Sequence, residues 1–422
     1  METTRNLLEV KLREFDPEVD ALIREEMQRN EETINLIASE NYPPKSSMKA
    51  ISSMLSGIYS EGYPGERYYR GLENIDKIES LAVARAKAVF GAEHANVQAL
   101  SGSSSNIAAY LALLQLGDTI LSMDIDAGGH LSHGAKANIV AKLFKVHQYG
   151  VDAKTGLLDY DAIRAMALQI RPKLIVCGAS AYPRTIDFSR FGAIAKEAGA
   201  FLLADMAHIA GLVATGHHPS PVPHCDIVTT TTHKTLRMTR GALILCRREH
   251  AAKVDRAIFP VLQGGPHQAN IAAIAVGLKH LMTPEYADYV RRLLENASLL
   301  AAELMGLGFD VVSGGTDNHL LLLDLTAAGI DGDRASILLE EAGIIVNKNK
   351  VPGDKGTAKK PFGIRLGSPA VTTRGMGPEE VRRIARWVAD VIRHPQDSTL
   401  RQRIKSEVAS LCRDFPIYRQ TF

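Results

Sequence analysis

Short apolar runs alternate with helix-like stretches from about residue 77 to residue 250, and this alternation constrains the fold more than any other feature. The runs cover residues 119–123, 173–177, 201–204, 226–229 and 241–246, and the helix-like stretches cover 77–90, 105–115, 159–170 and 188–199. Because the runs are mostly apolar throughout, they suit strands that are buried on both faces. Strand and helix in repetition predict an α/β fold with a mostly parallel sheet covered by helices.

Three domains are predicted. Residues 1–55 form an N-terminal helical arm, in which Asp16 can cap a helix and Pro17 suits its first position. Residues 56–283 form the large α/β domain. Residues 284–422 form a smaller α+β domain, with strands expected at 310–313, 320–325, 344–346 and 363–366. The arm is too small for a core of its own, so we expect it to pack on another domain or another subunit.

Charge and composition exclude several partners. The chain of 422 residues has 49 Lys+Arg against 47 Asp+Glu, a formal charge of +2, which offers no broad field for nucleic acid or an anionic membrane. No signal-like segment and no membrane-length apolar stretch occurs, and the four cysteines form no CxxC pair. We therefore expect a cytoplasmic protein without nucleic acid or membrane partners.

Lys234 lies in the most informative string of the sequence. Four threonines and His233 precede it, and Arg237 and Arg240 follow it. A lysine at a strand end is usually a solvated surface group, but neighbouring cations lower the pKa of an amine toward the nucleophilic free base. Lys234 could therefore form a Schiff base with an aldehyde cofactor.

Asp205 ends the preceding apolar run. A carboxylate there can be a helix cap or a satisfied buried group, or it can pair with a protonated ring nitrogen, as pyridoxal phosphate enzymes require. Because ligands gather at the carboxyl ends of parallel strands, Asp205 and Lys234 together favour the cofactor interpretation.

A phosphate site is predicted at residues 101–106, where serines and Gly102 precede a helix. Free backbone N–H groups and the helix dipole can hold a dianion there, although serines at a helix start also serve as plain N-caps. The turn at 263–266 offers a second close approach of backbone to an anion. The absence of a G-x-G-x-x-G opening a βα unit and of a P-loop string argues against dinucleotide and P-loop sites.

Other polar groups have two possible roles each. Arg365 lies in a predicted strand, where a guanidinium suits either a substrate carboxylate or an internal salt bridge. Glu61, in a turn rich in Tyr, Gly and Pro, is either a general acid/base or part of a structural corner. His130 and His133 lack a third ligand at metal-site spacing, so no metal is predicted, and stacking of His130 on a flat cofactor ring fits better.

Several long strings resemble serine hydroxymethyltransferases, and the resemblance runs along nearly the whole chain. The strings are LIASEN at 36–41, YPGERYY at 63–69, DMAHIAGL at 205–212, TTTTHKT at 229–235, QGGP at 263–266, SGGTDNH at 313–319, VNKN at 346–349 and GIRLGSPAVTTRG at 363–375.

This resemblance implies a fold-type I pyridoxal phosphate enzyme with a large-domain sheet of seven-stranded type. It implies pyridoxal 5'-phosphate as cofactor and tetrahydrofolate as co-substrate. The implied reaction interconverts serine plus tetrahydrofolate with glycine plus 5,10-methylenetetrahydrofolate. Because the family usually shares active sites between subunits, a homodimer is expected.

The resemblance also implies roles for single residues. Lys234 would carry the Schiff base and Glu61 would be the acid/base group, with Tyr59 and His233 beside them. The implied cofactor-binding residues are Asp205, His208, His130, Gly102, Ser103, Ser180, Thr231 and, from the neighbouring subunit, Gly265. The implied substrate-binding residues are Ser39, Tyr69 and Arg365, and the implied folate-binding residues are Tyr68, Gly129, Leu131 and Asn347.

Four motifs depart from the family pattern. The usual YYGG has Arg70 in third place, SGSQAN reads SGSSSN, GPRGG begins with Met238-Thr239 and AHGGH reads DAGGH at 126–130. These departures motivate an alternative, a paralogue acting as an aldolase, transaldolase or hydroxymethyltransferase on threonine-like or α-substituted amino acids. A non-enzymatic binding protein on this fold is a third possibility, but it should have lost Lys234, Asp205 or Arg365.

Overall fold

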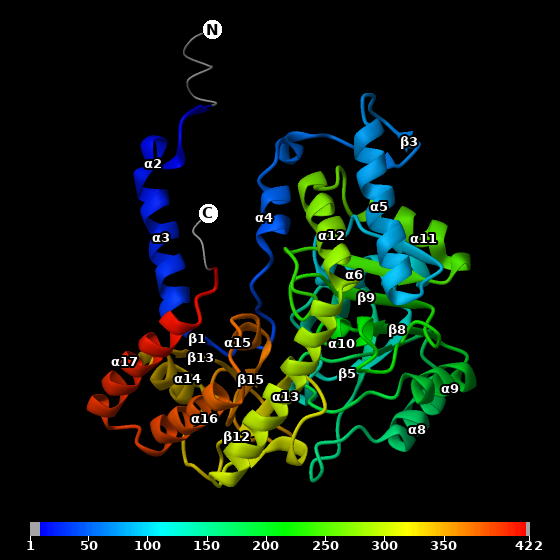
Figure 1. The fold of residues 1–422 in the computed structure, drawn as a ribbon. Coiled ribbons are helices and arrows are strands. Elements are labelled where there is room, and N and C mark those ends of the chain that lie inside the picture. The colour runs from blue at the N-terminus through cyan, green and yellow to red at the C-terminus, as the bar shows by residue number, and fades with distance from the viewer. Residues whose placement is uncertain (1–8, 419–422) are drawn as a thin grey trace.

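A seven-stranded sheet forms the centre of the computed structural model, which describes residues 9–418 (Figure 1). The strand order is β4-β10-β9-β8-β7-β5-β6. The strands are β4 (His94–Asn96), β5 (Thr119–Met123), β6 (Lys145–Tyr149), β7 (Leu174–Cys177), β8 (Phe201–Asp205), β9 (Ile227–Thr231) and β10 (Ala242–Cys246). Within this sheet β10 runs opposite to the other six strands, which are parallel to one another. The predicted α/β fold with a mostly parallel sheet is confirmed.

Helices cover both faces of this sheet. Successive residues of a strand point to opposite faces, and in β7 Ile175 packs into one apolar core while Leu174 and Val176 pack into the other. The first core includes residues of α5 (Glu73–Phe90), α8 (Tyr160–Ile170), α9 (Phe188–Ala198) and α12 (Gln268–Leu281), and the second includes residues of α6 (Gly102–Leu113) and α11 (Ala251–Arg256). Burial on both faces explains the unbroken apolar runs of the sequence.

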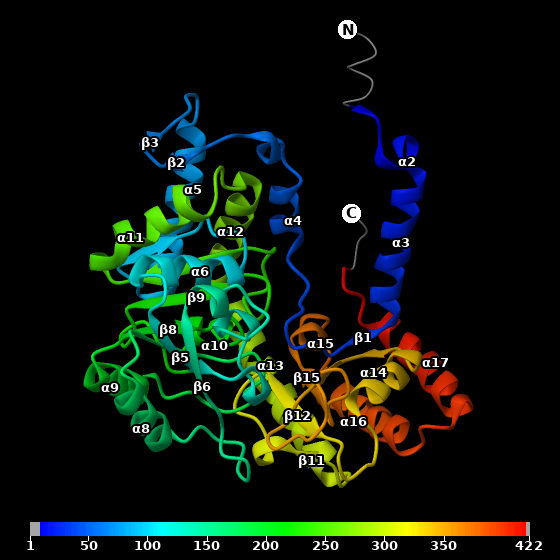
Figure 2. The same cartoon turned by 180° about the vertical axis from the view of Figure 1, so that it is seen from behind.

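A smaller antiparallel sheet follows the long helix α13 (Pro284–Gly306). Its strand order is β11-β12-β15-β14, with β11 (Asp310–Val311), β12 (Leu320–Asp324), β14 (Asn347–Asn349) and β15 (Gly363–Gly367). The apolar core of this part includes residues of α14 (Gly332–Glu341), α16 (Pro378–Arg393) and α17 (Ser398–Asp414) (Figure 2). Because α13 contributes Tyr289 to the large core and Leu304 to the small one, it joins the two parts. The domain limits at 55/56 and 283/284 stay predictions.

Several elements differ from expectation, among them β14, which was not predicted. The sequence analysis missed β4, which has three residues, and β6, whose side chains are largely polar because it lies at a sheet edge. It also missed α12. The strand expected at 344–346 is β13 (Ile344–Ile345), which pairs in parallel with β1 (Ile34–Asn35) rather than with the small sheet.

The N-terminal arm contains α3 (Pro17–Glu32) and α4 (Lys45–Ile51). Asp16 caps α3 by accepting a 3.0 Å hydrogen bond from Val19 N, and Pro17 takes the first position, both as predicted. No residue of α3 is buried, and Leu22 is 64% exposed. Figures 1 and 2 show α3 standing apart from α4, which lies along α12. The apolar stripe of α3, formed by Val19, Leu22, Ile23 and Met27, is 43–64% exposed, although the helix also contacts α17.

Two general expectations can be compared with residues 9–418. We find no helix there with the length and apolar character that a membrane span requires. The four cysteines are free and buried.

Candidate active site

A cavity of about 130 Å³ lies at the carboxyl ends of the parallel strands. Loops that follow β4, β5, β7, β8 and β9 meet there, as ligand sites of open α/β sheets do. Its lining comprises Ser101, Gly102, Ser103, His130, Ala179, Ser180, Asp205, Ala207, His208, Thr231, His233, Lys234 and Arg240. Every cofactor-binding residue that was expected from a single subunit is in this set.

Lys234 follows β9 by three residues and is 9% exposed. Its Nζ forms no hydrogen bond or ion pair with the described residues. Burial lowers the pKa of this amine to about 8, and Arg365 and Arg240 act in the same direction against Asp205. The neutral amine is therefore accessible near neutral pH, as a nucleophile requires.

Asp205 is a buried carboxylate held at the end of β8. Its Oδ2 accepts hydrogen bonds from His133 Nε2 at 3.0 Å and Asn106 Nδ2 at 2.9 Å, and its Oδ1 accepts one from Ala207 N at 3.0 Å. Burial would raise its pKa, but the hydrogen bond from His133 and the nearby charges of His133 and Lys234 hold the pKa well below its usual range. The group stays ionised and can keep a proton on a ring nitrogen.

The start of α6 combines capping with an anion cradle. Ser101 and Ser104 form a capping box, so these two serines serve as plain N-caps. Gly102 and Ser103 line the cavity instead. A Cβ on residue 102 would lie 2.7 Å from Thr231 Cγ2, and Thr231 Oγ1 is buried without a hydrogen-bond partner. Backbone donors and an unsatisfied hydroxyl thus converge where a phosphate can bind.

His130 lies on the loop after β5 and its Nδ1 is 2.7 Å from Ser132 Oγ. Burial lowers its pKa to about 4, which favours the neutral ring at neutral pH. The fold also brings Asp205 close to His130 and His133, so a third group of metal-ligand type is present that spacing did not reveal. Hydrogen bonds already occupy the facing atoms of His133 and Asp205.

Arg365 is a buried cation in the middle of β15. It donates to Asn347 Oδ1 at 3.1 Å and to the Ser180 carbonyl at 2.6 Å. Within residues 9–418 no carboxylate lies within 4.0 Å of it, so the internal salt bridge considered above is wrong. Burial lowers its pKa to about 10, which leaves it charged at neutral pH. A buried guanidinium of this kind favours an incoming carboxylate.

A second group of predicted site residues lies elsewhere. A Cβ on Gly264 would lie 3.1 Å from Glu61 Oε1, and one on Gly265 would lie 3.6 Å from the Tyr59 ring. The Tyr59 and Tyr69 rings are 5.6 Å apart, and Tyr68 contacts Phe259. We call Tyr59, Glu61, Tyr68, Tyr69 and Gly265 the Glu61 group. None of them lines the Lys234 cavity of its own chain.

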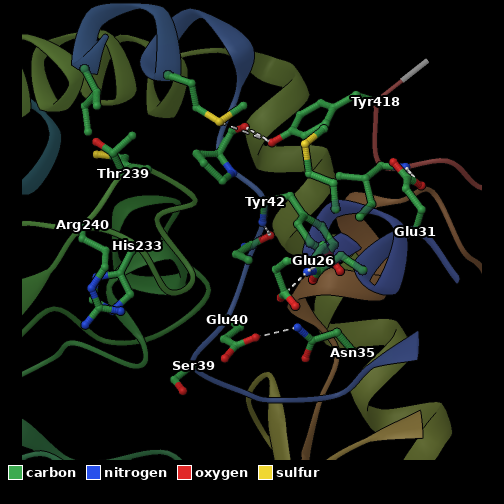
Figure 3. Close-up of a pocket in the computed structure, with 18 of the residues that line it drawn as sticks. Glu26, Glu31, Asn35, Ser39, Glu40, Tyr42, His233, Thr239, Arg240 and Tyr418 are labelled. Carbon is green, nitrogen blue, oxygen red and sulfur yellow. Dashed lines mark hydrogen bonds between the residues drawn. The ribbon is translucent and has the colours of Figure 1, made fainter. Parts of the chain in front are cut away.

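The remaining predicted residues lie near the Lys234 cavity. Ser39 lines a groove that also contains His233 and Arg240 (Figure 3). Asn347 contacts Arg365. Leu131 is half exposed beside His130, and Gly129 packs so closely that a Cβ there would lie 2.2 Å from the Met123 carbonyl.

Comparisons with known proteins decide the family. The family model described as serine hydroxymethyltransferase matches residues 12–388. The chain belongs to the serine hydroxymethyltransferase family. It is 53% identical over 408 residues to a serine hydroxymethyltransferase of Cyanothece, with 96% of each chain covered. It is 50% identical over 411 residues to that of Acidobacterium capsulatum, with 97% of this chain and 96% of the relative covered. The predicted pyridoxal phosphate-dependent transferase of fold type I is confirmed.

The cavity of this serine hydroxymethyltransferase family member fits pyridoxal phosphate. Four features border one space: an ionised acid, a phosphate cradle with an unsatisfied hydroxyl, a neutral imidazole and a buried amine. Sequence reasoning missed Asn106 and His133 as partners of Asp205, although it had noted both strings.

Proposed function

We propose that this member of the family moves a hydroxymethyl group between serine and tetrahydrofolate, with pyridoxal 5'-phosphate held in the Lys234 cavity. One observation carries the proposal: a buried amine and a buried carboxylate line the same cavity, and a buried guanidinium without a carboxylate partner lies beside it. An aldehyde, a ring nitrogen and an amino acid carboxylate are the groups that these three side chains match.

Each residue has a defined task at this site. Pyridoxal phosphate, when bound, supplies an electron sink for cleavage of a bond at the amino acid α-carbon. Lys234 Nζ would attach the cofactor, and Asp205 would keep a proton on the ring nitrogen. Gly102 and Ser103 would hold the phosphate, together with Gly265 of the neighbouring subunit, and His130 would stack on the ring. Ser180, Thr231 and His208 contribute further polar contacts from the cavity wall.

The substrate amino acid is bound through its carboxylate, and its reaction depends on proton transfer. Arg365 binds the carboxylate with its guanidinium fork, assisted by Ser39 and by Tyr69 of the neighbouring subunit. Binding of the carboxylate orients the substrate side chain that carries the hydroxymethyl group. Glu61 moves protons on the hydroxymethyl group or on folate, with Tyr59 beside it, and His233 adds a neutral imidazole because burial lowers its pKa to about 3.

Arg365→Ala is expected to raise the KM for serine by about 30-fold or more, since removing one member of a buried charge pair costs about 2 kcal/mol or more. The affinity for pyridoxal phosphate should stay near that of the wild type. Steady-state kinetics with a cofactor titration measures both. Arg365→Lys is the matched control, because it keeps the charge and loses the fork; unchanged serine KM in both variants contradicts the assignment.

The capture of pyridoxal phosphate by the cofactor-free protein should become faster as pH rises, with a midpoint near 8. The neutral amine is the nucleophile, and its fraction grows as pH passes through the pKa of Lys234, which is lowered to about 8. Stopped-flow absorbance over pH 6–11 measures the rate. Arg240→Gln should raise the midpoint, because Arg240 helps to lower this pKa. A wild-type midpoint near 10.5 contradicts the account.

The active site is shared between two copies of the chain in a homodimer. The Glu61 group does not line the Lys234 cavity of its own chain, and Met27, an exposed apolar residue of α3, lines a groove of about 770 Å³. In Figure 3, Glu26, Glu31 and Tyr42 lie on one side of this groove and His233 and Arg240 on the other. A second copy that fills the groove would bring its Glu61 group toward Lys234.

Mixing two inactive variants should restore activity. Lys234→Ala and Glu61→Gln dimers, unfolded together and refolded at equal amounts, give mixed dimers as half of the population, and each has one intact site. About a quarter of wild-type turnover is therefore expected. Each variant refolded alone is the control. Turnover in the mixture no greater than that of the separate variants contradicts a shared site.

Folate binds between the subunits in this proposal. Gly129, Leu131 and Asn347 come from the Lys234 side, and Tyr68 comes from the Glu61 group. Among the departures from the family pattern, Met238 is buried against Gly277 and does not line the Lys234 cavity, so it gives no argument for the aldolase alternative.

The decisive assay offers serine with and without tetrahydrofolate, beside allo-threonine and α-methylserine. Glycine should form from serine only when tetrahydrofolate is present. Folate-independent release of glycine from serine, or faster turnover of α-methylserine, would favour the paralogue.

We also propose that the protein acts in the cytoplasm, which its four buried free cysteines support.

A further inference from the structure

Arg67 fixes the backbone on both sides of Glu61. Its Nη1 donates a 2.7 Å hydrogen bond to the Ser60 carbonyl and another of 2.7 Å to the Gly62 carbonyl. The carbonyl of Glu61 itself accepts a 3.1 Å hydrogen bond from Tyr68 N. Three successive carbonyls are therefore held around one acidic side chain.

The guanidinium of Arg67 is buried and pairs with two carboxylates of α5. It lies in a hairpin of β2 (Gly62–Tyr63) and β3 (Glu66–Arg67) beside this helix (Figure 2). Its Nη2 donates to Glu79 Oε2 at 2.6 Å, and its Nε donates to Asp76 Oδ1 at 2.9 Å. The side chains of Arg67 and Glu79 are 3% and 2% exposed. Because the donors of a guanidinium lie in one rigid plane, a lysine cannot reproduce this set of contacts.

Glu79 connects the hairpin to two further elements. Its Oε1 accepts a 2.6 Å hydrogen bond from Gln98 Nε2, and its Oε2 accepts one of 3.2 Å from Gln268 Nε2. Gln98 follows β4, and Gln268 begins α12. The same two amides donate to the Gly62 carbonyl at 3.0 Å and to Ser60 Oγ at 2.8 Å. Glu79 thereby orients both amides toward the two residues that flank position 61.

Glu61 differs from the other acids of this network in how its carboxylate is used. Asp76 and Glu79 each accept hydrogen bonds on both carboxylate oxygens. The half-buried carboxylate of Glu61 forms no hydrogen bond or ion pair within residues 9–418. A structural corner explains why the backbone is fixed, but it does not require an acid that is left unpaired at its centre. The arrangement therefore favours a group that is kept available for a ligand.

The carboxylate of Glu61 faces the turn at 263–266. A Cβ on Gly264 would lie 3.1 Å from Glu61 Oε1. Gln263 Nε2 donates a 2.8 Å hydrogen bond to the Gln98 carbonyl, which connects this turn to the same network. The acid and the turn are therefore held in one fixed arrangement.

We propose that Arg67, itself held by Glu79, is a positioning residue that determines where the Glu61 carboxylate lies. The purpose of that position rests on the proposed function, in which Glu61 moves protons at the Lys234 site of the neighbouring subunit. A proton donor or acceptor acts only within hydrogen-bond reach of the reacting atom. Displacement of Glu61 should therefore lower kcat more than it changes the KM for serine, whose carboxylate is bound elsewhere.

The first test measures amide hydrogen exchange of the ligand-free Arg67→Lys protein by mass spectrometry. Lysine keeps the charge but cannot donate to both carbonyls and to Glu79 at once. We expect exchange in residues 60–68 to become about 10-fold faster, because hydrogen bonds from a charged donor are lost. Exchange at the wild-type rate in this segment overturns the proposal, whether or not the protein acts on serine.

Arg85→Lys is the matched control. Arg85 lies on α5 and donates a 2.6 Å hydrogen bond to the Ala275 carbonyl of α12, so it also joins these two helices, but it forms no hydrogen bond with residues 60–68. Its replacement should leave both the exchange of this segment and kcat unchanged. Equally faster exchange in both variants would indicate a general loosening of the helix pair and would overturn the role of Arg67.

The second test is a double-mutant cycle between Arg67→Lys and Glu61→Gln, measured as kcat and KM for serine. Arg67→Lys alone should lower kcat about 10-fold and leave the KM within about 2-fold, since small displacements of a reacting group have effects of this size or larger. In the Glu61→Gln background the same change should lower the residual kcat by less than about 2-fold, because the acid that Arg67 positions is already absent.

The cycle separates failure of this inference from failure of the proposed function. An equal loss of kcat in both backgrounds overturns the positioning role and leaves the role of Glu61 intact. Wild-type kcat in Glu61→Gln alone refutes the proposed acid/base role, and the positioning role with it.

If Arg67→Lys does not fold, Glu79→Gln replaces it in both tests. Glutamine keeps the shape and one acceptor oxygen but loses the charge that pairs with Arg67. Exchange about 3-fold faster in residues 60–68, with a loss of kcat that disappears in the Glu61→Gln background, supports the proposal. Wild-type exchange, or equal losses of kcat in both backgrounds, overturns it.

Discussion

Lys234→Ala protein is expected to purify without the visible absorption band of covalently attached pyridoxal phosphate and to lose turnover by about 10²–10⁴-fold or more. Lys234 has the one amine side chain that lines the cavity, and burial lowers its pKa to about 8. The change removes the amine of Lys234, which is both the point of attachment and a neutral base. Absorbance spectra and serine-dependent glycine formation measure the two losses.

The matched control for this variant is Lys196→Ala. Lys196 is exposed near the end of α9 and does not line the cavity, so its removal should leave band and turnover unchanged. A Lys234→Ala protein that keeps both the wild-type spectrum and the wild-type rate would contradict the assignment.

Asp205→Asn should retain the attached cofactor and still lose turnover by about 10²–10³-fold, the loss seen when a buried electrostatic group is removed from a reaction centre. The side chain keeps its shape but loses the charge that holds a proton on the ring nitrogen. The hydrogen bonds from His133 and Asn106 can still reach an amide oxygen, so the fold should persist. Turnover and the visible spectrum, measured together, separate loss of chemistry from loss of cofactor.

Asp187→Asn serves as the control for the charge change, because Asp187 caps α9 and does not line the cavity. Its turnover should equal that of the wild type. Asp205→Asn with full turnover would show that no ring nitrogen depends on this carboxylate.

Most of the sheet could be predicted from the sequence because its strands are buried on both faces. The run at 119–123 matches β5, since a central strand needs apolar side chains in both directions. Strand β6 could not be found in this way. It lies at the sheet edge, where Lys145 and His147 are exposed, so it has no continuous apolar run. Strand β13 was found, but its pairing with β1 depends on a contact between residues about 310 positions apart.

The site residues could be predicted where they lie directly at the end of a strand, and less well elsewhere. Asp205 and Lys234 lie at the ends of adjacent parallel strands, so their common cavity followed from topology. The partners of Asp205 and His208 did not follow. His133 lies 72 residues from Asp205, and His319 lies 111 residues from His208, so only the folded chain brings them together. The separation of the Glu61 group from Lys234 also needed the fold.

The most direct measurement is to reduce the protein with borohydride in the presence of pyridoxal phosphate and to locate the modified residue by peptide mass spectrometry. The account predicts a single pyridoxyl phosphate adduct on the peptide that contains Lys234. An adduct on a different lysine, or no adduct at all, would contradict it.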